Sequence, residues 1–165
     1  MLGLTPLGAF HTAISLIAVA AGLIAFVRYA EITLDNALGR IYLLTTVITA
    51  ATGFGIFQHG GWGAPHTLGV ITLVVLAVAI LAGKTDLFGR ASPYIETVGY
   101  SATFLFHMIP AVTETSTRLP LGSPLLASRD DPALQAAVAV LLVAFLIGAT
   151  LQVLRLRARF RRYAS

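Results

Sequence analysis

The feature that most constrains this chain is its set of apolar segments near 20 residues long that carry no charged side chain. A helix of about 20 residues spans the roughly 30 Å hydrocarbon core of a bilayer. Hydrophobic residues make up 57% of the chain and charged residues only 11%, whereas about a quarter of the residues of soluble proteins are charged. The sequence therefore predicts an all-α integral membrane protein, and a nucleic-acid-binding function is disfavoured despite the net charge of +4.

Five membrane-spanning helices are expected within a single membrane domain, residues 1–165. Their approximate bounds are 5–27, 41–57, 65–83, 93–113 and 133–154. With the N-terminus outside, nine basic residues fall in the inner segments: Arg28, Arg40, Lys84, Arg90, Arg155, Arg157, Arg159, Arg161 and Arg162. Only Arg118 and Arg129 fall outside. The positive-inside rule then predicts a multi-pass protein of the bacterial inner membrane with a cytoplasmic C-terminus.

A five-residue phrase occurs twice, as Gly8-Ala9-Phe10-His11-Thr12 and as Gly63-Ala64-Pro65-His66-Thr67. Each copy leads into a long apolar run, which is followed by a Gly-Arg pair, Gly39-Arg40 or Gly89-Arg90. We interpret this as two parallel-repeat hairpins, helices one and two and helices three and four, followed by a C-terminal helix. The repeat predicts that the two histidines lie at the same depth.

All four histidines, His11, His59, His66 and His107, are expected in the outer half of the membrane. We expect two pairs, His11 with His66 and His59 with His107. Ionisable residues in membrane helices usually serve a function, and neutral imidazole binds haem iron, copper and zinc. The first hypothesis is therefore that these four histidines bind haem b or a transition metal (copper, iron or zinc) and transfer electrons, with a quinone or another redox partner. Alternatively, His59 is an interfacial residue and the phrase is a duplication remnant maintained by packing.

The fourth predicted span carries a polar stripe. Its members recur at spacings of four, three, four and seven residues, which places them on one helix face: Glu96, Tyr100, Thr103, His107 and Glu114. The second hypothesis is a small proton-coupled transporter with its proton path along this stripe. Thr45, Thr49 and Thr52 share a face of the second span, and we interpret them as packing residues that bond to their own backbone.

A third hypothesis is a non-catalytic subunit of a larger membrane complex, and a homo-oligomer is also left open. The chain contains no cysteine, which excludes disulfides and thiolate metal sites. No nucleophile motif and no His-Glu-x-x-His motif is present, so hydrolase chemistry has little support.

The segment Ala37-Leu38-Gly39-Arg40-Ile41-Tyr42 opens the second span, with a histidine-led span on either side of it. Over residues 8–83, this arrangement resembles uncharacterised bacterial predicted membrane proteins. Their histidine-bearing helical bundles are similar to four-helix b-type membrane cytochromes. The resemblance implies a helical bundle in which histidines hold haem.

Overall fold

The computed structural model describes residues 5–57 and 61–163, and all the regular structure in these ranges is helical. The helices are α1 (Pro6–Tyr29), α2 (Ala37–Gly53), α3 (Ala64–Lys84), α4 (Ser92–Arg118) and α5 (Pro132–Tyr163). A short 3-10 helix, Gly89–Ala91, precedes α4. The predicted all-helical fold is confirmed.

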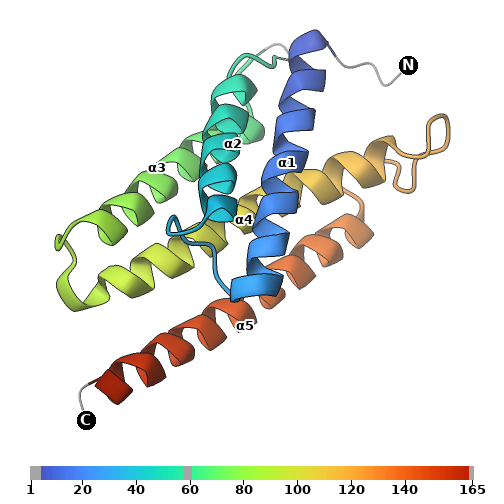
Figure 1. Ribbon diagram of the computed structural model, residues 1–165. Coiled ribbons are helices and arrows are strands. Elements are labelled where there is room, and N and C mark those ends of the chain that lie inside the picture. Colours follow the sequence, from blue (N-terminus) through green and yellow to red (C-terminus); the bar gives the residue numbers. More distant parts are fainter. Residues whose placement is uncertain (1–4, 58–60, 164–165) are drawn as a thin grey trace.

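The helices pack mainly as neighbours in sequence. α1 lies along α2, α3 lies along α4, and α5 packs against α4 (Figure 1). The two hairpins meet through α2 with α3 and through α1 with α4. α3, α4 and α5 run obliquely to α1 in the view of Figure 1. This arrangement brings α4 into contact with α1, α3 and α5, so its polar stripe lies among other helices.

Capping residues explain where the first two helices begin. The Thr5 hydroxyl accepts a hydrogen bond from the Gly8 amide (3.1 Å), and Pro6 occupies the first turn of α1, where its missing N–H costs nothing. The Asn36 side chain caps α2 in the same way, through the Gly39 amide (3.0 Å). This cap makes α2 begin four residues before the predicted start at residue 41. The helix also ends at Gly53 rather than at residue 57.

The last two helices are longer than predicted. α4 continues through Pro110 to Arg118, although a polar loop was expected from residue 115. Glu114 and Arg118 form an ion pair four residues apart across the last turn, which stabilises helical structure there. α5 continues to Tyr163 instead of ending near residue 154.

Small residues let α1 pack closely against its neighbours. Ala18, Ala21 and Ala25 are buried. A Cβ atom on Gly22 would lie only 2.6 Å from Cδ2 of the Phe104 ring, so α1 and α4 meet here at glycine distance. Ala18 and Gly22 lie four residues apart on one face of α1, and stripes of small residues are typical of helix contacts in membranes.

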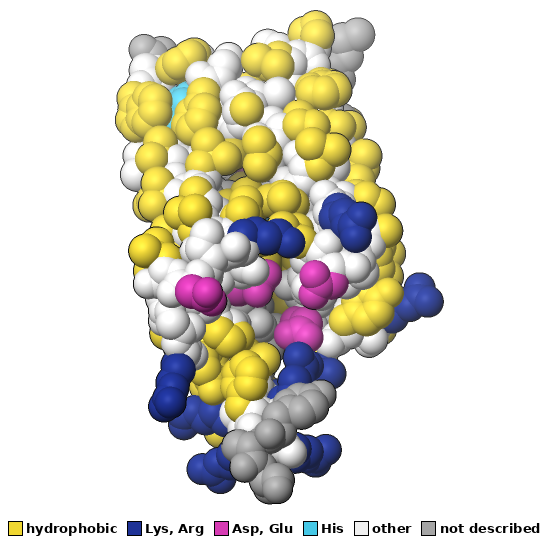
Figure 2. All heavy atoms as spheres, turned by 60° about the vertical axis from the view of Figure 1, so that its left-hand side comes forward, with side chains coloured by type: hydrophobic (Ala, Val, Ile, Leu, Met, Phe, Trp, Pro, Cys, Tyr) yellow, Lys and Arg dark blue, Asp and Glu magenta, His cyan; other side chains and the backbone are white. Residues whose placement is uncertain are grey.

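Three of the helices, α1, α3 and α5, are long and apolar enough to cross a membrane, whereas α2 is a shorter apolar helix. Large apolar side chains are exposed along them; Val27 is 83% exposed and Val140 66%. Figure 2 shows one side of the molecule. Apolar side chains cover one end of it, and the side chains of Lys, Arg, Asp and Glu gather toward the opposite end. This surface is compatible with a membrane protein.

Candidate functional site

Two buried side-chain hydrogen bonds join α2 to α4, one helical turn apart. The Tyr42 hydroxyl lies 2.8 Å from the Thr103 hydroxyl, and the Thr46 hydroxyl lies 3.0 Å from Nε2 of His107. The first three side chains are fully buried and His107 is 8% exposed. Tyr42 and Thr46 lie four residues apart on one face of α2. We name the four side chains of these two bonds the α2–α4 relay: His107, Thr46, Tyr42 and Thr103.

The donor is determined in one of the two bonds of the α2–α4 relay. The Thr103 hydroxyl donates its single proton to the Tyr100 carbonyl (2.8 Å), so the Thr103 oxygen accepts from the Tyr42 hydroxyl. In the other bond, either the Thr46 hydroxyl or Nε2–H of His107 is the donor, according to the tautomer of the imidazole.

A third cross-helix bond joins α1 to the same helix α2. Nδ1 of His11 lies 3.1 Å from the Thr52 hydroxyl, which itself donates to the Ile48 carbonyl (2.8 Å). His11 is therefore the donor, and its Nε2 is an acceptor. Gly53 makes room for the ring, since a Cβ there would lie 3.3 Å from Cε1 of His11.

The predicted threonine face of α2 is confirmed in part. Thr45 and Thr52 bond back to backbone carbonyls of their own helix, as expected. The Thr49 hydroxyl is buried and has no hydrogen-bond partner within the described ranges. Thr49 lies one turn beyond Thr46 and one turn before Thr52, so polar groups line this face of α2 between the two histidines.

His66 has a different and local role. Its Nδ1 accepts a hydrogen bond from the Gly63 amide (3.1 Å), which caps the start of α3. The ring stacks on Phe57 (centroids 4.9 Å apart) and on Trp62 (5.0 Å). His66 is only 5% exposed, and its Nε2 has no hydrogen-bond partner among the described residues.

The expected symmetry of His11 and His66 is not found. His11 is the sixth residue of α1 and His66 is the third residue of α3, a difference of three residues or about 4.5 Å of helix rise. No hydrogen bond or ring contact joins the two side chains within residues 5–57 and 61–163. His59, the expected partner of His107, lies outside the described residues.

The haem or metal hypothesis gains no support from these positions. Within the described ranges, no group of three or more His, Asp or Glu side chains could hold a metal ion. Nδ1 of His66 is engaged in the helix cap while its Nε2 has no hydrogen-bond partner in the described part of the chain, and no contact found there joins this ring to that of His11. Haem b, copper, iron or zinc binding therefore stays a prediction from the sequence.

Glu96 and Tyr100 lie in the N-terminal part of α4, between its first residue and Thr103. The Glu96 carboxylate is half-buried against Gly83 of α3, where a side chain would not fit. Its charge interacts with those of Lys84, Asp35 and Glu31. Tyr100 is fully buried, and its hydroxyl has no hydrogen-bond partner in the described part of the chain. These residues continue the polar face of the α2–α4 relay toward the charged end of the molecule.

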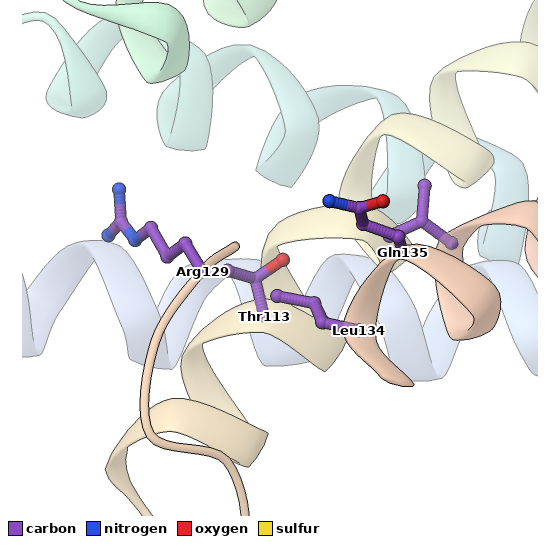
Figure 3. Close-up of a pocket in the computed structure, with 5 residues that line it drawn as sticks. Thr113, Arg129, Leu134 and Gln135 are labelled. Carbon is purple, nitrogen blue, oxygen red and sulfur yellow. The ribbon is translucent and has the colours of Figure 1, made fainter. Parts of the chain in front are cut away.

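Glu114 lies at the other end of α4 in a surface ion-pair network. Its carboxylate pairs with Arg118 and with Arg129 (2.7 Å). Beside it is an open pocket of about 330 Å³. In Figure 3 Arg129 and Gln135 lie on opposite sides of this pocket, with Thr113 between them. Since Glu114 is already paired with two cations, it differs in environment from the buried members of the stripe.

Comparison with family models, with curated proteins and with solved structures found no match to this chain. Two members of the site, Tyr42 and Thr46, were missed as site residues by the sequence analysis. A sequence pattern could have indicated them, because Tyr42, Thr46 and Thr49 follow one another at spacings of four and three on one face of α2. That pattern does not reveal which helix the face meets.

Proposed function

We propose that this chain is a small proton-coupled transporter of the bacterial inner membrane, and that the α2–α4 relay is its proton path. All five helices then cross the membrane, with the N-terminus outside and the C-terminus in the cytoplasm. The basic residues at the inner ends of the helices and at the end of α5 support this orientation. His11 and His107 then lie in the outer half, and Glu96 lies near the cytoplasmic end.

The observation that carries the proposal is the pair of buried hydrogen bonds, one helical turn apart, that join Thr46 to His107 and Tyr42 to Thr103. Polar side chains inside membrane helices are costly to maintain and mark proton relays in pumps and transporters. In this proposal a proton taken up by His107 is passed on through the hydroxyls of Thr46, Tyr42 and Thr103, each of which releases its own proton as it receives one. The proton released at Thr103 goes to the Glu96 carboxylate, two helical turns along α4, and rotation of the hydroxyls resets the series.

The two ends of the relay have suitable groups for proton exchange. On the outer side, the free Nε2 of His11 can accept a proton, and the polar face of α2 leads from Thr52 to Thr46. On the inner side, Glu96 is a half-buried carboxylate, and Tyr100 lies one turn from it toward Thr103. A carboxylate within reach of bulk water is a suitable final acceptor.

Proton flux into liposomes tests the proposal. The purified protein is reconstituted, a potassium gradient with valinomycin sets the membrane potential, and an internal dye reports pH. We expect flux above that of protein-free liposomes for the wild type, and flux at the protein-free level for Tyr42→Phe, which removes one hydroxyl of the relay. Tyr94→Phe is the matched control, because Tyr94 packs on Phe160 outside the relay.

Equal flux in the wild type, Tyr42→Phe and protein-free liposomes would contradict the proposal. An absorption spectrum of the purified protein, with metal analysis, addresses the competing hypothesis. A Soret band, or iron, copper or zinc bound in stoichiometric amount, would favour electron transfer by haem or metal instead. A stable partner recovered with the protein, with the histidines dispensable, would favour the role of a subunit in a larger complex.

A further inference from the structure

A second cavity lies away from the relay, between α4, α5 and the C-terminal end of α1. Its volume is about 440 Å³, within the range of small-molecule sites. Most of its wall is apolar, including Phe26, Phe104, Leu105, Met108 and Phe145. It exists because α5 packs on α4 and meets α1 only near the end of that helix, through Gln152 and Arg155.

The polar groups of this cavity are confined to one end. Ser101 donates to the Gln152 side chain (2.8 Å), which in turn donates to the Ala30 carbonyl (2.9 Å). The hydrogen-bonding groups of Ser101 and Gln152 are therefore engaged with each other and with the Ala30 carbonyl. Arg155 donates to the Tyr29 carbonyl (2.9 Å) with one of its five N–H groups. Within the described ranges it has no carboxylate partner, so its positive charge is available at the mouth.

We propose that this cavity binds one acyl chain of an anionic phospholipid of the inner leaflet, with the lipid phosphate at Arg155. The apolar wall runs from the Arg155 end toward Met108 and Leu141, which is the direction from the cytoplasmic surface toward the membrane centre. Basic pockets between membrane helices on the cytoplasmic side bind anionic headgroups. Arg157 follows on the same helix and adds to the positive potential, whereas Arg159 pairs with Glu31 (3.4 Å).

The charge pattern favours this occupant over a quinone. A quinone carbonyl needs a hydrogen-bond donor beside the ring, and the buried donors here, Ser101 and Gln152, already have acceptors. The group with spare donors is the exposed guanidinium at the mouth, which suits a phosphate. The lipid site rests on the membrane orientation given under the proposed function, but it does not depend on proton conduction.

Gly148 provides a direct test because it lines the cavity and a Cβ there would meet no atom within 4 Å. Gly148→Leu therefore adds side-chain volume to the cavity wall at a point where the Cβ atom meets no neighbour. Thr150→Leu is the matched control, since Thr150 is exposed on the same helix and does not line the cavity. For the headgroup, Arg155→Gln is compared with Arg157→Gln, which alters an exposed arginine outside the cavity.

Delipidated protein in detergent is incubated with phosphatidylglycerol or with phosphatidylcholine of the same acyl chains, and native mass spectrometry counts the bound lipids. We expect one phosphatidylglycerol per chain, its loss in Gly148→Leu, and its retention in Thr150→Leu. Arg155→Gln should reduce the preference for phosphatidylglycerol about fivefold, and Arg157→Gln should not. If Gly148→Leu does not fold, Ala144→Leu fills the same cavity.

Three results would overturn the proposal. They are equal lipid binding by Gly148→Leu and Thr150→Leu, equal binding of the two lipids by the wild type, and a quinone as the molecule that co-purifies. Because the measurement is made in detergent without a proton gradient, it gives the same answer whether or not the protein conducts protons.

Discussion

The two copies of the Gly-Ala-x-His-Thr phrase have the same chemistry in sequence and different roles in space. In the first copy, His11 donates a hydrogen bond across helices to Thr52 of α2. In the second, His66 accepts a hydrogen bond from the Gly63 amide at the start of α3, and its ring stacks on Phe57 and on Trp62. One histidine joins two helices, and the other begins a helix.

The residue at the variable position accounts for the difference. It is Phe10 in the first copy and Pro65 in the second. Proline is favoured in the first turn of a helix, so α3 begins within the phrase, whereas Pro6 makes α1 begin before it. A repeated motif therefore does not repeat a function when the helix start has shifted.

The largest expected effect is the difference in proton flux between two variants, one that changes His107 of the relay and one that changes His66 of the α3 cap. His107→Ala removes the outermost side chain of the relay and should reduce proton flux to the level of protein-free liposomes. His66→Ala, in the same assay, should retain the flux of the wild type, because the cap lies outside the relay. Size-exclusion chromatography checks that both variants elute as the wild type does. If two such folded variants lose the same amount of proton flux, His107 and His66 do not have the different roles described here.

The contribution of the His66 cap to the stability of the protein should be measurable. His66→Ala should lower the free energy of unfolding by about 1–2 kcal/mol, since it removes both a capping acceptor and the ring stack. His66→Gln should recover part of this loss, because glutamine at the same position can accept from the Gly63 amide. Thermal unfolding in detergent, followed by circular dichroism, measures both. A glutamine variant no more stable than the alanine variant would argue against capping.

A smaller effect is expected for the bond between His11 and Thr52. Thr52→Val keeps the branched shape and removes the hydroxyl, so stability should fall by about 0.6 kcal/mol, the usual magnitude for hydrogen bonds between membrane helices. His11→Ala combined with Thr52→Val should cost less than the sum of the two single changes, because they share one interaction. Strict additivity in the same unfolding assay would mean that the bond contributes nothing.

The smallest effect is expected at Glu114. Glu114→Gln weakens exposed ion pairs with Arg118 and Arg129, and such pairs contribute about 0.2–1 kcal/mol. Flux should equal that of the wild type, which would separate Glu114 from the other members of the predicted stripe. If Glu114→Gln loses proton flux while its stability is unchanged, Glu114 is part of the proton path, as the sequence predicted.

Much of the fold followed from the sequence, because apolar periodicity and caps are local properties. The five helices and the polar face of Tyr100, Thr103 and His107 are of this kind. The partners of that face were not predictable, since the pairing of Thr46 with His107 depends on how α2 docks on α4. The equal depth expected for His11 and His66 stays a prediction, and the prolines that set each helix start give the two histidines different positions within their helices.

The most direct test of the relay uses its central link. Thr46 bonds to His107 and lies one helical turn from Tyr42 on the same face of α2, and Thr46→Val removes that hydroxyl while preserving the branched side chain. Valinomycin-driven proton uptake is measured in liposomes that contain equal amounts of folded wild-type or variant protein. The account predicts uptake by the wild type and none above the protein-free level for Thr46→Val. Equal uptake by the two proteins would contradict it.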